Sequence, residues 1–181
     1  MHRIIYPGYT WYSCPIESKN VIIVNSFSKT WFIPGIRVGW VVAADNDLAS
    51  KFAHVLSLQS GGVNLFGQLF MAELLAEINY EALLQKRLQI LSKRKTLFET
   101  TLRRYKISDL NQIQGGMNFY LNLQKDSKII AKKLLKNAGV AIVPGYLFEG
   151  RDSCYARVGF GAVMEKEIAE GIKRIASFIV G

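Results

Sequence analysis

The chain has 181 residues, half of them apolar and a fifth charged, with a net charge of +9. This composition excludes a disordered chain, and no apolar run approaches the roughly 18 residues of a membrane span. Because Cys14 and Cys154 lack metal-binding spacing and no secretory leader is recognisable, we expect a cytoplasmic protein with reduced cysteines, no membrane contact and no metal.

The first predicted elements are two short strands after an irregular lead-in. Residues 1–18 contain two prolines and a glycine among mixed polar and aromatic residues, which is typical of turns. Residues 21–24 and 38–42 are apolar runs, and each is predicted to form a buried strand. A short loop joins the two strands.

This loop collects the chemistry of a phosphate site. Lys29 lies just beyond the first strand, where a rigid sheet presents it, and Arg37 follows it eight residues later. Ser26 and Ser28 add two hydroxyls. Because a guanidinium and hydroxyls hold a phosphate dianion well, the set suits a phosphate-bearing aldehyde cofactor bound to the lysine as a Schiff base.

Three helices are predicted after the second strand. The cluster Asp45-Asn46-Asp47 predicts a helix over residues 47–58, and Ser60-Gly61-Gly62 ends it. The next helix is predicted over residues 64–77. Its apolar residues at helical spacing are Leu65, Leu69, Ala72 and Ala76. Residues 80–105 are predicted to form one long amphipathic helix, with Lys95 in the single gap of its apolar stripe.

The remainder of the chain is predicted to be a compact unit of short strands and helices. Strands are expected over residues 115–121, 140–143 and 155–160. A helix over residues 127–138 is expected to start at Asp126 or Ser127 and to stop at Gly139. The closing helix is defined by Met164, Ile168, Ile172, Ile175 and Ile179. This alternation predicts a layered α/β domain.

The positive charge alone does not indicate a nucleic-acid partner. Many basic residues lie along the long predicted helix, mostly off its apolar stripe, as on a solvated face. They are Lys86, Arg87, Lys93, Arg94, Lys95, Arg103 and Arg104. The sequence shows no recognition helix, zinc finger or aromatic RNA-binding motif, so we expect no nucleic-acid binding.

A second candidate site lies in the carboxyl-terminal unit. Residues 143–148 form a Pro-Gly loop, and residues 154–160 form a strand that contains Arg157. A planar guanidinium binds a carboxylate through two parallel hydrogen bonds, which a lysine does poorly. Arg157 is therefore a candidate carboxylate-binding residue, although an arginine in a solvated edge strand is the simpler alternative.

The first of these regions closely resembles the lysine signature of class I and II aminotransferases, which are fold type I enzymes that use pyridoxal phosphate. The match covers residues 26–40. Lys29 matches the position that bonds the cofactor, and Arg37 matches the position that binds its phosphate. Ser26 and Ser28 match the small hydroxyl positions of the same motif.

The second region resembles the Pro-Gly-x-x-Phe loop and the arginine strand of the same family. By this resemblance, Arg157 is the residue that binds the substrate α-carboxylate. One departure from the family pattern is Phe32, because the family more often has a small residue there. The packing of the lysine loop is therefore expected to differ.

The resemblance implies an α/β fold with parts of two domains. Residues 1–79 are expected to be a remnant of the large cofactor-binding domain, with an incomplete mixed sheet. Residues 80–105 are expected to form the helix that links it to a complete small α+β domain over residues 106–181.

The family also has an Asp-Glu-x-Tyr segment before the lysine strand, which binds the pyridine nitrogen and the phenolic oxygen of the cofactor. The run Ile4-Ile5-Tyr6 resembles the residues that follow this segment, and this register places its aspartate before Met1. We therefore expect the chain to be the carboxyl half of a protein about twice as long, associated with a missing amino-terminal half or with a second copy.

The function implied by the resemblance is the transfer of an amino group between an α-amino acid and a 2-oxo acid, through an aldimine of pyridoxal phosphate on Lys29. Because half of the residues around the cofactor are missing, we expect this chain alone to bind pyridoxal phosphate weakly or not at all and to be inactive. Two alternatives remain: an inert remnant or binding module that keeps an anion site, and another reaction of the same fold, such as β-elimination or decarboxylation.

Overall fold

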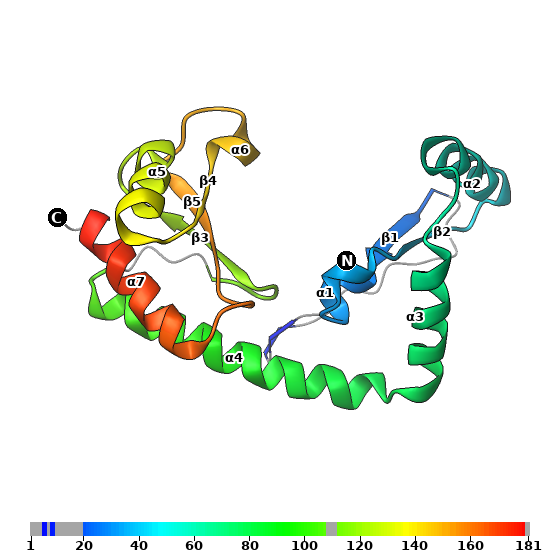
Figure 1. The fold of residues 1–181 in the computed structure, drawn as a ribbon, viewed down its shortest axis with the longest axis horizontal. Coiled ribbons are helices and arrows are strands. Elements are labelled where there is room, and N and C mark those ends of the chain that lie inside the picture. Colours follow the sequence, from blue (N-terminus) through cyan, green and yellow to red (C-terminus); the bar gives the residue numbers. More distant parts are fainter. Residues whose placement is uncertain (1–4, 7, 10–19, 108–111, 180–181) are drawn as a thin grey trace. The chain divides into compact units, whose positions relative to one another are not determined.

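The structure is a computed structural model that describes residues 5, 6, 8, 9, 20–107 and 112–179. Most of the predicted lead-in over residues 1–18, with Cys14 and the register position Met1, lies outside the described residues. The chain divides into two compact units, Met1–Leu88 and Gln89–Gly181, which we describe in turn (Figure 1).

The first unit contains a two-stranded antiparallel ribbon. Strand β1 (Ile22–Ser26) pairs with β2 (Gly39–Ala43), and Ser26 faces Gly39 at one end. Both predicted strands are confirmed, but the prediction that they are buried is wrong, since Val24 is 61% exposed. The physical reason is that two strands form a single layer, and the described residues provide no second layer over their apolar side chains.

Two short helical turns lie between the strands. Helix α1 (Phe27–Thr30) follows β1 directly, and the 3₁₀ turn η1 (Pro34–Ile36) comes before Arg37. The backbone N–H of Phe27 donates to the carbonyl of Val38 at 3.1 Å, so the ribbon is tied together one step beyond its last pair. The predicted loop is thus partly helical, and Lys29 lies within the turn α1.

Helices α2 and α3 follow the ribbon, as predicted. Helix α2 (Asn46–Ser60) begins where Asp45 Oδ1 accepts a hydrogen bond from Leu48 N at 2.9 Å. It ends at Gly61, whose φ of 63° suits a glycine.

Helix α3 (Leu65–Glu77) begins at Asn64. It buries Gly67 and Met71, whereas the predicted stripe that includes Leu65 and Leu69 is exposed. The spacing fails to identify the buried face because the apolar residues of α3 are distributed around the helix and form no single stripe.

Helix α4 (Tyr80–Arg104) confirms the long helix that was predicted. Its first two turns belong to the first unit, where Leu84 is buried. In the second unit the same stripe continues with Leu91, Phe98 and Leu102, which are also buried. The gap in the stripe is occupied by Lys95, whose ammonium lies 3.6 Å from the carboxylate of Glu99 one turn later.

The second unit is built on a three-stranded antiparallel sheet in the order β3-β5-β4. These strands are β3 (Asn118–Asn122), β5 (Tyr155–Gly159) and the short β4 (Val143–Pro144). Helices α5 (Ser127–Ala138), α6 (Tyr146–Glu149) and α7 (Glu165–Ile179) complete the unit. Every predicted strand and helix of this unit exists, although residues 140–142 lie outside β4.

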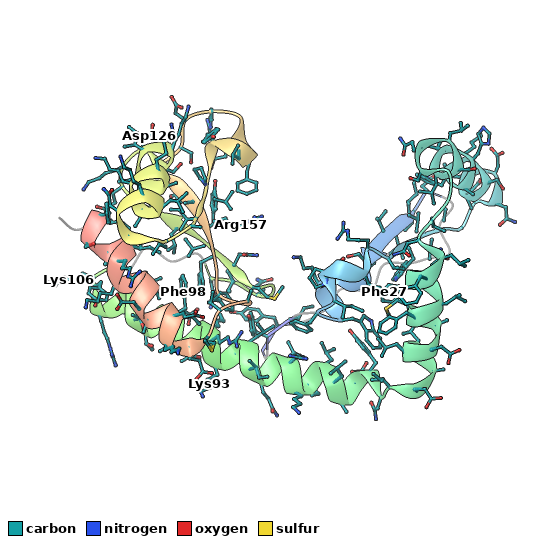
Figure 2. All side chains as sticks on the ribbon, viewed as in Figure 1. Phe27, Lys93, Phe98, Lys106, Asp126 and Arg157 are labelled. Carbon is teal, nitrogen blue, oxygen red and sulfur yellow. The ribbon has the colours of Figure 1, made fainter. Side chains whose placement is uncertain are left out.

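The core of the second unit is a cluster of aromatic and aliphatic side chains. The ring centres of Phe98, which Figure 2 labels, and Phe119 lie 4.6 Å apart in a stack. Phe160 packs against both rings. Helix α5 is capped by Asp126 and stopped by Gly139, as predicted. The isoleucines of α7 are buried at helical spacing. Among the described residues, no helix is both long and apolar enough to cross a bilayer.

Candidate functional site

Four of the predicted site residues meet at one end of the β1–β2 ribbon. Ser26 is the last residue of β1 and faces the first residue of β2. The bond between Phe27 and Val38 continues the pairing by one step. Ser28 and Arg37 are the next residues on each side, and Lys29 follows Ser28. The fold therefore gathers an amine, a guanidinium and two hydroxyls in one loop.

The turn that contains Lys29 is anchored by the aromatic residues that follow it. Trp31 is buried, its backbone N–H donates to the carbonyl of Phe27 at 2.9 Å, and the centre of its ring lies 4.6 Å from that of Tyr80 in α4. Phe32 has a φ of 59°, and the guanidinium of Arg87 lies 5.4 Å from its ring centre. The large residue at this departure from the family pattern thus packs against α4. Lys29 itself is exposed.

Arg37 lies in an unusual backbone conformation. Its φ of 55° and ψ of 43° are left-handed, a region that residues with a side chain adopt rarely. Its Nη1 donates a hydrogen bond to the carbonyl of Pro34 at 3.0 Å. This bond fixes one edge of the guanidinium against the turn η1, and the side chain as a whole is exposed.

The start of helix α3 packs against the same loop. Asn64 Nδ2 donates to the carbonyl of Ile36 at 2.9 Å, while its Oδ1 accepts from the N–H of Gly67 at 2.9 Å. A Cβ on Gly67 would lie 2.8 Å from Val38 Cγ2 and 2.9 Å from the Ile36 carbonyl oxygen. The close approach of α3 to the loop therefore requires glycine at this position.

These donors fit a phosphate-bearing aldehyde cofactor. A guanidinium and hydroxyl groups are good partners for a phosphate dianion, and a primary amine is the group that condenses with an aldehyde. Lys29 and Arg37 are both exposed, and Ser26 and Ser28 are partly so. The loop thus presents this donor set to an incoming ligand.

Arg157, the fifth predicted site residue, belongs to the second unit. It lies in the central strand β5, opposite Tyr120 of β3 and Val143 of β4. Its guanidinium carbon lies 5.0 Å from the ring centre of Phe148 (Figure 2). It lines a hollow of about 270 Å³ together with Asn118, Phe119, Tyr120 and Phe148. Arg157 therefore lies in a central strand and not in an edge strand, with an exposed side chain and a hollow beside it.

A hydrogen-bonded cluster supports the wall of this hollow. The hydroxyl of Tyr120 donates to a carboxylate oxygen of Glu149, and Ser153 Oγ donates to the same oxygen at 3.0 Å. The bond from Tyr120, and then that from Ser153, lowers the pKa of Glu149 from its usual value. Burial, and then the bond to Glu149, raises the pKa of Tyr120.

The Pro-Gly loop requires glycine at residue 145 because this cluster leaves no room for a side chain. A Cβ on Gly145 would lie 2.5 Å from the hydroxyl of Tyr120 and 2.7 Å from Ser153 Oγ. The N–H of Gly145 also donates to the carbonyl of Tyr155 at 2.8 Å, so the loop lies close against β5.

The second unit also has a larger hollow, of about 630 Å³, along α7. None of the predicted site residues lines it. Among the described residues, no three His, Cys, Asp or Glu side chains gather as metal ligands would.

Sequence reasoning missed three residues that support these sites. They are Asn64, Phe148 and Glu149. The signal for Asn64 was available, because an asparagine just before an apolar run is a typical helix cap. No local pattern indicates that its amide also bonds to a loop 28 residues earlier.

Comparisons with known proteins agree on one family. The family described as aminotransferase class I and II matches residues 12–175. Valine–pyruvate aminotransferase of Mycobacterium tuberculosis is 30% identical, over 98% of this chain and 46% of its own length. The crystal structure of an aminotransferase from the same organism has a TM-score of 0.83 at 27% identity, and covers 98% of this chain and 46% of its own.

A relative of another kind also matches. The HTH-type transcriptional regulator NorG of Staphylococcus aureus is 25% identical, over 88% of this chain and 36% of its own length. In each of these comparisons the chain spans at most about half the length of the protein that it matches.

Proposed function

Because this chain belongs to the family of class I and II aminotransferases, we propose that it supplies part of the active site for amino-group transfer between an α-amino acid and a 2-oxo acid. The observation that supports this proposal is the loop that gathers Ser26, Ser28, Lys29 and Arg37 at one end of the ribbon. Among ligands, pyridoxal 5'-phosphate combines the phosphate and the aldehyde that this donor set suits.

The four residues of the loop have two roles, phosphate binding and attachment of the cofactor. Arg37 and the hydroxyls of Ser26 and Ser28 bind the phosphate, because these donors match its charge and its oxygens. The amine of Lys29 would hold the cofactor, and once released it would carry the proton from the substrate α-carbon to the cofactor carbon. When bound, the cofactor provides the electron-withdrawing ring that makes this proton acidic.

Arg157 binds the α-carboxylate of the substrate. Its guanidinium lies against the face of Phe148, which holds the planar group in one orientation beside the hollow. A carboxylate that enters the hollow can then accept two parallel hydrogen bonds. This arrangement orients the amino acid for proton transfer.

The domain assignment follows from the same proposal. Residues 1–79 are part of the cofactor-binding domain, residues 80–105 form the connecting helix, and residues 106–181 form the small domain. Helix α3 exposes several large apolar side chains, and Phe66 is 78% exposed, so we expect another protein surface to cover it. The cover is a second copy of the chain or the remaining half of the enzyme.

Without that cover, the chain holds only part of the cofactor site. We propose that by itself it binds pyridoxal phosphate so weakly that millimolar concentrations are needed to occupy Lys29, and that it is inactive alone. The same site in the complete protein also suits β-elimination or decarboxylation, because the same electron-withdrawing ring would accept the electron pair of whichever bond breaks at the α-carbon.

A second candidate function is a binding module without catalysis. The match to NorG favours it, because that relative is named as a transcriptional regulator and not as an enzyme. In such a module, Arg37 and the serines hold the phosphate while Lys29 forms no covalent bond.

Covalent trapping tests the proposal. The full chain is incubated with millimolar pyridoxal phosphate, reduced with borohydride and mapped by mass spectrometry. We expect labelling at Lys29 well above that at Lys51, which is also exposed and pairs with Asp47 at 2.6 Å. Equal labelling of the two lysines contradicts the catalytic proposal. Binding that is undiminished in Lys29→Ala, with no labelling of Lys29 in the wild type, supports the binding module.

A further inference from the structure

We infer that Asn64 is a positioning residue for Arg37, and that the first turn of α3 sets the shape of the loop from which Arg37 binds phosphate. This inference rests on the proposed function for its ligand. Asn64 itself touches no ligand in this scheme, because it acts through the peptide bond between Ile36 and Arg37.

The backbone on both sides of Arg37 is held by hydrogen bonds, one from Asn64 in the next helix and one from Phe27 at the other end of the loop. The carbonyl before it, that of Ile36, accepts from Asn64 Nδ2 at 2.9 Å. The carbonyl after it, that of Val38, accepts from Phe27 N at 3.1 Å. A left-handed arginine persists only where the surrounding structure determines it, and these two bonds supply that constraint.

An asparagine is well suited to this position because its amide provides both an acceptor and a donor. Its Oδ1 caps α3 by accepting from Gly67 N, and its Nδ2 reaches the loop. Aspartate or serine can replace the cap, but aspartate has no donor and the serine hydroxyl is too short to reach both partners.

Packing supplies the second constraint. The backbone of Gly67 lies so close to the loop that an added Cβ would be 2.7 Å from Asn64 Nδ2 and 2.8 Å from Val38 Cγ2. The loop therefore rests directly on the backbone of α3. Asn64 and Gly67 together fix Ile36 and Val38, the two neighbours of Arg37.

These constraints determine where the guanidinium of Arg37 points. With the flanking residues fixed and its Nη1 donating to the carbonyl of Pro34, the guanidinium is held against the turn η1. Release of the Ile36 carbonyl allows Arg37 to return to an ordinary backbone conformation, which points its side chain elsewhere.

The experiment begins with the wild-type full chain. A through-hydrogen-bond coupling measured by NMR between Asn64 Nδ2 and the Ile36 carbonyl carbon is expected, and its absence overturns the inference. This measurement needs no variant, so it stands even if a substitution prevents folding.

Variants then test the effect on Arg37. In Asn64→Ser, which retains the cap oxygen, we expect the Arg37 Cα and Cβ shifts and the three-bond amide coupling to lose their left-handed values. The matched control is Asn79→Ser, which alters an asparagine that caps α4 through Ala82 N at 3.1 Å. Unchanged Arg37 signals in Asn64→Ser overturn the inference.

A trapping assay links the loop to phosphate binding. Labelling of Lys29 is compared between pyridoxal phosphate and pyridoxal, which lacks the phosphate. We expect Asn64→Ser to lower this preference about threefold or more, since a misplaced anchor binds phosphate poorly. A preference equal to that of the wild type overturns the positioning role. If the wild type itself shows no preference, the proposed phosphate site fails, while the Arg37 signals still decide whether Asn64 holds the loop.

Discussion

The guanidinium carbon of Arg157 lies 5.0 Å from the centre of the Phe148 ring, so a charged side chain in the middle of a sheet rests on an aromatic face. Contacts of this kind contribute about 0.5–1 kcal/mol at exposed sites. Phe148→Leu is therefore expected to release Arg157, with a rise in fast motion of its Nε–H bond in ¹⁵N relaxation. Phe148→Tyr keeps the ring and serves as the control. Equal motion in the wild type and Phe148→Leu contradicts the prediction.

A second prediction concerns acid stability. Because the bond from Tyr120 is the largest cause that lowers the pKa of Glu149, this carboxylate stabilises the folded state above its unfolded pKa, near 4.5. The stabilisation is lost as the pH falls through the lowered folded value. In Tyr120→Phe, the pKa of Glu149 is expected to rise towards 4.5, which a ¹³C titration of its carboxyl carbon measures. Ser153→Ala is expected to raise the pKa of Glu149 by less than Tyr120→Phe does, because its bond has the smaller effect. A rise in Ser153→Ala that equals or exceeds that in Tyr120→Phe contradicts this prediction.

A third prediction concerns alkaline stability, because the pKa of Tyr120 is shifted in the opposite direction to that of Glu149. Burial and the bond to Glu149 raise the pKa of Tyr120 above 10.0, so its contribution is complete below pH 10.0 and is lost as the pH rises through the folded value. Glu149→Gln is expected to bring the ionisation of Tyr120 to a lower pH in an ultraviolet titration. An unchanged titration contradicts this prediction.

Two helical glycines are expected to respond oppositely to alanine. At Gly171 in α7, an added Cβ meets no atom within 4 Å, so Gly171→Ala is expected to stabilise by about 0.5–1 kcal/mol. At Gly67, the added carbon falls under 3.0 Å from three atoms, and Gly67→Ala is expected to destabilise by about 1–3 kcal/mol. Melting temperatures from circular dichroism compare the two. A gain of stability in Gly67→Ala contradicts the close packing of α3.

The exposed apolar surface of the first unit predicts self-association. The side chains of Leu65 and Phe66 on α3 are largely exposed, and burial of apolar area contributes about 25 cal/mol per Å². Light scattering of the wild type is expected to show a mass that rises with concentration. Phe66→Asp is expected to weaken this association, whereas Leu135→Asp, at an exposed position on α5, leaves it unchanged. A wild-type monomer at all concentrations contradicts the prediction.

Local sequence signals predicted the elements well because their causes are local. Asp126 and Gly139 mark the two ends of α5 through a side-chain cap and a left-handed glycine, and both are confirmed. The long helix α4 follows from its apolar stripe, in which Phe98 and Leu102 are buried. The turn α1 was missed, since four residues are too few to show a period.

Burial and the supporting contacts of the sites could not be predicted in the same way. Val24 lies in an apolar run that is typical of a buried strand, but the burial of its side chain depends on which surfaces cover the ribbon. Asn64 bonds to Ile36 and Phe148 packs on Arg157, and both contacts join residues that are distant in sequence. The family pattern indicated the candidate site residues, whereas the contacts that Asn64 and Phe148 make with their neighbours required coordinates.

Helix α4 has a thermodynamic consequence, because one uninterrupted rod contributes side chains to two hydrophobic cores. Tyr80 and Leu84 pack in the first unit, while Leu91 and Phe98 pack in the second. If heating melts one core, the adjoining turns lose their tertiary support and fray towards the boundary near Leu88. Unfolding of either core therefore destabilises the part of α4 that packs in the other core. The unfolding transitions of the two units are thus coupled through this helix.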